Sequence, residues 1–179
     1  NKIIECIKYF KETKPNEKNY LLVGARIDWA NPKLLFDLSE EHFLSNININ
    51  NGKNTNICKT DSNKYECFYH APCGIDYVIH SKSTFINNID KNLVIAGTRH
   101  DMIMVGVGIC NNFFTCNITS VCPVIHQNHG YPFGKVHVGV HKHGKELLSN
   151  NAKCNGNQKS ITDCKHRMIM NNKKLEILP

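Results

Sequence analysis

The chain has 179 residues, a formal net charge of +7 with histidine neutral, and 41% apolar residues, which is adequate for a core but low for one large core. This length suits one ordinary domain or two small ones. No apolar run approaches the roughly 20 residues of a membrane-spanning helix, so no transmembrane segment is expected in this chain. The positive charge favours an anionic partner, although lysines also serve simply to keep a small domain soluble.

The nine cysteines are widely and unevenly spaced, and no Cys-x-x-Cys pair occurs. Structural zinc sites usually show two tight pairs, so neither a metal nor a cofactor is expected. Wide spacing is typical of a disulfide-stapled secreted protein, and the odd count leaves at least one thiol unpaired or paired outside this chain. The first residue is Asn rather than Met, which favours a mature or excised fragment. The single glycosylation sequon, Asn117-Ile118-Thr119, fits a secretory route.

Residues 1–74 are expected to form a small, cysteine-containing, β-rich region. Apolar residues between positions 3 and 10 fall at helical intervals, but the stretch is too short to decide between helix and strand. Residues 20–29 predict a buried strand. Residues 34–44 fit a strand followed by a short helix, and the Asn-rich stretch after them reads as a loop. The four cysteines of this region are expected to form two internal bridges.

From residue 75 the pattern changes to short apolar runs separated by turn residues. Three of these runs predict successive strands, at residues 75–80, 92–97 and 101–110. Alternating valines predict a further strand at residues 136–141, and residues 160–164 predict a short helical turn. The sequence therefore predicts a β-rich α+β fold, with a second domain at residues 75–179.

Three cysteine-containing stretches carry a family resemblance. They are GVGICNN at residues 106–112, the segment at residues 121–131, and AKCNGNQKSITDCKH at residues 152–166. Read together they resemble a scavenger receptor cysteine-rich domain, over about residues 75–179. The resemblance implies a curved antiparallel sheet cradling one helix, which it places at residues 119–127.

The same resemblance implies a disulfide between Cys154 and Cys164. The last two cysteines of the family are absent, and their usual partners align with Cys110 and Cys122. Those two must therefore pair differently, either among themselves and the extra Cys116 or with the N-terminal region.

The resemblance also bears on cation binding. The carboxylates that bind a cation in the family fall on amides here, at Asn112, Asn150 and Gln158. Calcium draws most of its affinity from anionic oxygen ligands, so the cation site is expected to be degenerate.

A basic, histidine-rich stretch surrounds the predicted strand at residues 136–141. It comprises Lys135, His137, His141, Lys142, His143 and Lys145. If the valines face the core, the alternate residues face outward. Such a stripe suits a sulfated glycan or an acidic surface, more strongly below about pH 6.5, where histidine becomes charged. A two-histidine metal site at His141 and His143 is a weaker alternative, and a solvated basic strand edge is the commoner case.

No catalytic signature occurs: there is no papain-type cysteine context, G-x-S-x-G, H-E-x-x-H, P-loop or dinucleotide fingerprint. We therefore expect a secreted or surface-exposed, non-enzymatic recognition and adhesion module that binds a protein or an anionic glycan, and no nucleic acid. The alternatives are a structural subunit of a larger extracellular or parasite-surface complex, and a hydrolase of an unrecognised fold. The Asn-, Lys- and Ile-rich composition is typical of AT-rich genomes such as those of apicomplexan parasites, whose surface adhesins contain similar domains.

Overall fold

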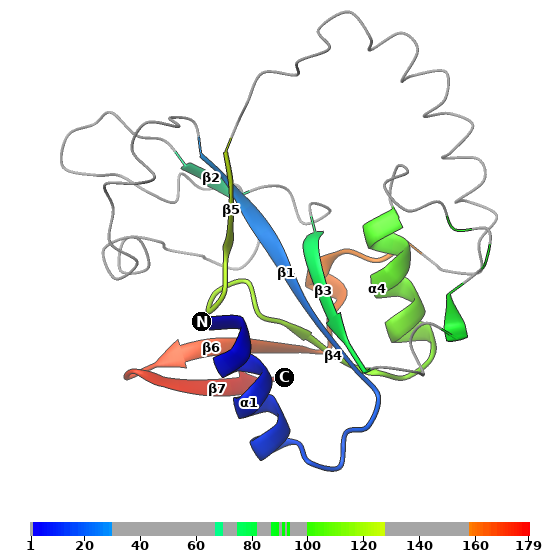
Figure 1. Cartoon of the computed structure of the whole chain (residues 1–179), viewed down its shortest axis with the longest axis horizontal. Helices are drawn as coiled ribbons and strands as arrows, with labels where there is room; N and C mark the ends of the chain where they lie inside the picture. Colours follow the sequence, from blue (N-terminus) through cyan, green and yellow to red (C-terminus); the bar gives the residue numbers. More distant parts are fainter. Residues whose placement is uncertain are drawn as a thin grey trace, which may run out of the picture.

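A computed structural model of the chain describes residues 2–29, 67–69, 75–81, 87–89, 91, 93, 100–127 and 158–179. In these ranges the chain combines helices with a sheet, which is the predicted α+β class (Figure 1). The helices are α1 (Lys2–Thr13), α4 (His100–Cys110) and the 3-10 helix η2 (Ile161–Asp163). The strands are β1 (Tyr20–Trp29), β2 (Cys67–Tyr69), β3 (Ile75–His80), β4 (Phe114–Asn117), β5 (Val124–Gln127), β6 (His166–Asn171) and β7 (Lys174–Leu178). None of these helices is long and apolar enough to cross a membrane.

Strand β1 is the centre of a seven-stranded sheet. Its first half pairs antiparallel with β3 and parallel with β4, and its second half pairs antiparallel with β2 and parallel with β5. Strand β6 pairs parallel with β4 and antiparallel with β7. The described sheet is therefore mixed, and the expectation of an antiparallel sheet is wrong. Parallel neighbours need a long connection, which the chain supplies between β1 and β4 and again between β4 and β6.

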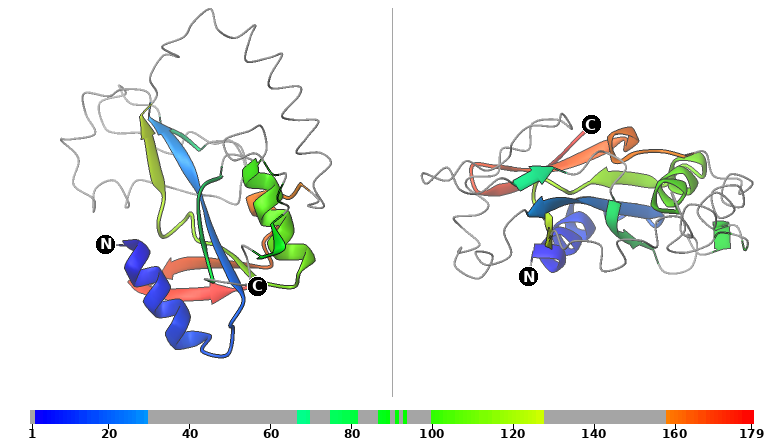
Figure 2. Two further views of the ribbon diagram at one scale, coloured as in Figure 1. Left: turned by 45° about the vertical axis from the view of Figure 1, so that its right-hand side comes forward. Right: turned by 90° about the horizontal axis from the view of Figure 1, so that it is seen from above.

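Strand β1 is buried on both faces, which explains its nearly continuous apolar sequence. Its odd-numbered residues from Leu21 to Ile27 are fully buried in one core together with residues of α4. Leu22, which points the opposite way, is fully buried in a second core with Cys6 and Phe10 of α1. The two helices thus cover opposite faces of β1, and in the edge-on view of Figure 2 α1 lies on one side of this strand. Full burial of each Leu or Ile side chain contributes roughly 1.5–3 kcal/mol.

The strand predicted at residues 101–110 is wrong, because these residues form α4. An apolar run with no clear periodicity fits a buried helix as well as a buried strand, and its length of about ten residues favours the helix. Asp101 in the first turn accepts a hydrogen bond from the Met102 N–H at 2.9 Å, a position where the helix dipole stabilises a carboxylate. Gly108 allows α4 to approach β1 closely, since a Cβ there would lie 2.8 Å from the Leu21 side chain.

The helix expected at residues 119–127 is also wrong. Residues 124–127 form β5 and pair with β1. Pro123 lacks a backbone N–H, and Val124 and Ile125 are β-branched, so this segment favours a strand over a helix. Residues 118–123, which we call the arch, connect β4 to β5, and Ile118, Val121 and Cys122 of the arch are buried in the core with α1.

Several other sequence predictions can be compared directly with the described residues. The strands predicted at residues 20–29 and 75–80 and the helical turn predicted at residues 160–164 are confirmed by β1, β3 and η2. The undecided N-terminal stretch is a helix, α1. Of the strand predicted at residues 92–97, Leu93 alone is described, and the strand at residues 136–141 lies outside the described residues. Strands from both predicted regions, 1–74 and 75–179, lie in one sheet; the division itself stays a prediction.

Candidate functional site

The six residues predicted to bind a ligand lie outside the part of the chain that the structure describes. They are Lys135, His137, His141, Lys142, His143 and Lys145. Asn150 of the expected degenerate cation site and Cys154 of the expected disulfide also lie outside it. These assignments stay predictions. Within the described ranges, no group of three or more His, Cys, Asp or Glu side chains is arranged to hold a metal ion.

Asn112, another member of the expected cation site, has a structural role at the end of α4. It adopts a φ of 57°, in the left-handed region. Its N–H donates to the carbonyl of Ile109 at 3.1 Å, and the Phe113 N–H donates to the carbonyl of Gly108 at 2.9 Å. This pair of bonds is a Schellman motif, in which Asn is accepted at the left-handed position. An amide at this position is therefore explained without a cation. Gln158, the remaining member, is half-buried just before η2.

Cys164 is the described half of the expected Cys154–Cys164 bridge. It carries a free thiol and packs against the core that contains α4. Burial, followed by the charge of Asp163, raises the pKa of this thiol to about 12. Because Cys154 lies outside the described residues, the bridge stays a prediction.

Tyr77 connects the two sides of β1. It stands opposite Gly24 in the β1–β3 ladder, where the register shifts at an extra residue, Asp76. Since Gly24 has no side chain, the tip of the Tyr77 ring lies directly on it. The hydroxyl then reaches the arch, on the other side of β1, and donates to the main-chain oxygen of Cys122. Burial, and then the neighbouring Cys122, raises the pKa of Tyr77, so this hydroxyl remains a donor.

The glycosylation sequon forms the start of the arch. Thr119 is fully buried, and its hydroxyl accepts a hydrogen bond from the Ala25 N–H at 3.0 Å, in place of a ladder carbonyl. The same hydroxyl donates to Asn117 Oδ1 at 2.7 Å. Ser120 in turn donates to the carbonyl of Met168 at 2.6 Å, which ties the arch to β6. Both sequon side chains are engaged within the sheet, and glycosylation of Asn117 stays a prediction.

Three buried thiols meet where the arch packs against α1. Cys6, Cys116 and Cys122 belong to one apolar core. The neighbouring Cys122, followed by burial, raises the pKa of Cys6. Burial raises the pKa of Cys116 to about 12. A buried thiol with a raised pKa is a poor nucleophile, so these three cysteines have the chemistry of structural rather than catalytic groups.

The β6–β7 hairpin presents a basic face to solvent. Its strands are joined by Asn172-Lys173, both with positive φ (47° and 62°), as in a type I′ turn. One face packs against the core with α1 through the fully buried Met168 and its neighbours. Side chains alternate along a strand, so Arg167 and Lys174 project from the opposite face, and both are exposed.

Two more lysines extend this surface. Lys165, just before β6, and Lys173, in the turn, are exposed. The single acid between residues 165 and 178, Glu176, accepts a hydrogen bond from Asn171 Nδ2 at 2.9 Å. We call Lys165, Arg167, Lys173 and Lys174 the basic hairpin face.

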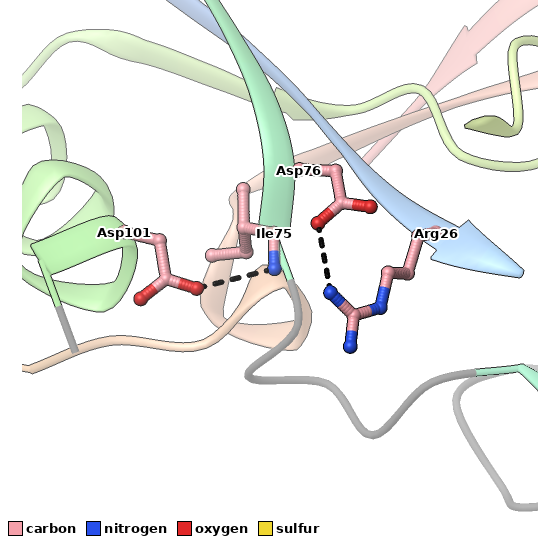
Figure 3. Close-up of polar contacts among 4 residues, drawn as sticks. All are labelled: Arg26, Ile75, Asp76 and Asp101. Atoms are coloured by element: carbon pink, nitrogen blue, oxygen red, sulfur yellow. Dashed lines mark hydrogen bonds and ion pairs between the residues drawn. The ribbon is translucent and has the colours of Figure 1, made fainter. Parts of the chain in front are cut away.

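A second charged group lies where α4, β1 and β3 meet (Figure 3). Arg26 Nη1 lies 3.4 Å from Asp76 Oδ1, and both side chains are partly exposed, so the pair contributes at most about 1 kcal/mol. Asp101 Oδ2 accepts a hydrogen bond from the Ile75 N–H at 3.3 Å. These contacts hold α4 and β1 against β3, so their role is structural.

No family model, curated protein or solved structure matches this chain. Function is therefore inferred from the sequence motifs and from the geometry described above.

Sequence reasoning missed the arch and its contacts. One available signal was Gly24: a glycine inside an apolar strand often marks a place where another group approaches the backbone closely. The basic hairpin face was also missed, although Lys173 and Lys174 are consecutive in the sequence and Lys165 and Arg167 are two residues apart.

Proposed function

We propose that the chain is a secreted or surface-exposed, non-enzymatic recognition module that binds an anionic ligand, either a sulfated glycan or an acidic protein surface. The observation that carries this proposal is the basic hairpin face. Three of its four cations lie on one short hairpin and Lys165 directly precedes it, and the one acid of the hairpin, Glu176, accepts a hydrogen bond from Asn171. Clustered cations of this kind attract and orient anionic partners.

Two properties of the sequence, its net charge and its family resemblance, favour the same role. The net charge of +7 favours anionic partners over the whole surface. The resemblance of residues 75–179 to a scavenger receptor cysteine-rich domain implies an extracellular binding role, and we retain that family assignment as part of the proposal.

Binding to heparin, as a sulfated probe, tests the proposal. We expect binding that weakens as salt rises, because exposed ion pairs are screened. Replacing Lys165, Arg167 and Lys174 by Gln removes three charges from the basic hairpin face. Each exposed pair contributes up to about 1 kcal/mol, so the loss of all three is expected to weaken binding by roughly tenfold to a hundredfold.

Two matched variants identify the surface. Replacing Lys8, Lys11 and Lys18 by Gln removes the same charge from exposed positions on and after α1. Replacing Lys135, Lys142 and Lys145 by Gln tests the histidine-rich stretch predicted from the sequence. The basic hairpin face is supported if its variant loses much more affinity than the α1 variant. Equal losses in all three variants would show a diffuse charge effect, and absence of salt-dependent binding to heparin and to an acidic protein would refute the proposal.

A further inference from the structure

Two buried cysteines from distant parts of the chain lie in one core. Cys6 lies in α1 and Cys122 in the arch, and they are 1% and 6% exposed. Both are free thiols in the core that α1 covers, and Cys122 is the neighbour that raises the pKa of Cys6 most. Cys116 belongs to the same core but raises the pKa of Cys6 less than Cys122 does. Cys164 packs against the other core.

The backbone of each of these two cysteines is fixed by contacts with the rest of the fold. Cys6 is part of a helix whose neighbour Phe10 is fully buried against the sheet. The Cys122 N–H donates to the carbonyl of Ile118 at 2.9 Å, and its own carbonyl accepts the Tyr77 hydroxyl. The backbone on each side is therefore fixed, and both thiols are buried in the same core.

We propose that Cys6 and Cys122 form a disulfide that ties α1 to the arch. The oxidant is a small-molecule or protein disulfide such as glutathione disulfide. One thiolate attacks a sulfur of the oxidant and expels a thiolate, and the second cysteine thiolate then attacks the mixed disulfide and expels the other. The two cysteines lose two protons and two electrons, and the oxidant becomes two thiols.

This bridge explains two features of the sequence. Cys122 aligns with a cysteine whose usual family partner is absent, and Cys6 supplies a partner from outside the resembling region. This pairing replaces the bridge expected for Cys6 within residues 1–74. The raised pKa of Cys6 makes exchange slow once the core is closed, so the bond forms as the chain folds and is then protected. The inference goes beyond the proposed function and does not depend on which ligand is bound.

The test is oxidative refolding of the full chain in a glutathione redox buffer, followed by alkylation with N-ethylmaleimide and peptide mapping without reduction. Trypsin alone is insufficient, because no Lys or Arg lies between Cys110 and Cys122. Chymotryptic cleavage after Phe113 or Phe114 separates Cys110 from the other two. We expect the Cys6 peptide to be joined by a disulfide to the peptide that contains Cys122. Neither Cys6 nor Cys122 should then carry the alkyl group.

Two variants identify the partner. Cys116→Ser is expected to keep the link, whereas Cys122→Ser is expected to abolish it and leave Cys6 alkylated. Recovery of Cys6 as an alkylated thiol in the refolded wild-type chain would overturn the proposal. So would fragment ions that place the wild-type link from Cys6 on a cysteine other than Cys122, and this result needs no variant to fold.

Discussion

The contact between Tyr77 and Gly24 makes a prediction that follows directly from the geometry. A Cβ added at position 24 would lie well inside contact distance of three ring atoms of Tyr77: Cζ, Oη and Cε1. The ring must therefore move by about 1 Å or more to restore ordinary van der Waals separation. Its hydroxyl then loses the carbonyl of Cys122, which it reaches only across Gly24. The substitution Gly24→Ala is thus expected to disturb the strand contact and the arch together.

The magnitude follows from these two effects. Overpacking of a filled core costs about 1–3 kcal/mol, and leaving a buried hydrogen-bonding group unsatisfied costs about 1–3 kcal/mol. Ala loses less backbone entropy on folding than Gly does, and this difference offsets roughly 0.5–1 kcal/mol of the cost. The free energy of unfolding of Gly24→Ala is therefore expected to fall by about 2–5 kcal/mol. Urea unfolding followed by circular dichroism measures it.

A double-mutant cycle separates this contact from a general intolerance of β1. Tyr77→Val removes the ring while keeping a strand-forming residue, and in that background Gly24→Ala should be neutral or slightly stabilising. Gly108→Ala is the comparison variant: its Cβ would lie 2.8 Å from Leu21 Cδ2, one side-chain end rather than a whole ring tip, so it is expected to cost less than Gly24→Ala. An equal cost of Gly24→Ala with and without the Tyr77 ring would refute the reasoning.

Three further predictions concern the arch and its thiols. Thr119→Val should lower the free energy of unfolding by about 1–3 kcal/mol, because the buried Ala25 N–H loses its acceptor, while Thr119→Ser should lose much less. An equal loss in both, measured by urea unfolding, would contradict this role. Burial raises the pKa values of Cys116 and Cys164 from 9.0 to about 12, so the stability they contribute is complete below pH 9 and is lost as pH rises toward 12. Urea titrations of the reduced chain across that window should show the decline, and a flat profile would contradict it. Closing the Cys6–Cys122 bridge, whose loop exceeds a hundred residues, should raise stability by about 4–5 kcal/mol over the reduced chain, and no gain would contradict the expected geometry.

Local patterns predict those parts of the fold in which one strand or turn determines its own structure. The apolar run of β1 and the short β-branched run of β3 predict strands because their residues favour a pleated, buried surface. The turn η2 follows from Ser160 and Asp163, whose side chains cap it. Each of these signals lies within a few residues of the element it predicts.

The two wrong elements fail for different reasons. The apolar run of α4 carries no periodicity, so burial on nearly all sides makes helix and strand look alike. The segment at residues 119–127 was assigned by resemblance, and Pro123 with its β-branched neighbours instead favours β5, which pairs with the second half of β1.

The candidate site depends on contacts between residues far apart in the chain. The Tyr77 hydroxyl and the Cys122 carbonyl are 45 residues apart in sequence. Cys6 meets Cys122 only because α1 packs on the same face of β1 as the arch. Composition gives the cysteine count and the positive charge, but neither quantity specifies which thiols meet or which cations share a face.

The central claim is that this chain works as an oxidised extracellular recognition module. Peptide mapping without reduction, on the chain recovered from the medium of secreting eukaryotic cells, tests it most directly. We expect the chain to be secreted with Cys154 linked to Cys164, Cys6 linked to Cys122, and the odd cysteine left as a thiol or bonded to another molecule. Recovery of a folded chain with all nine cysteines reduced would contradict the claim.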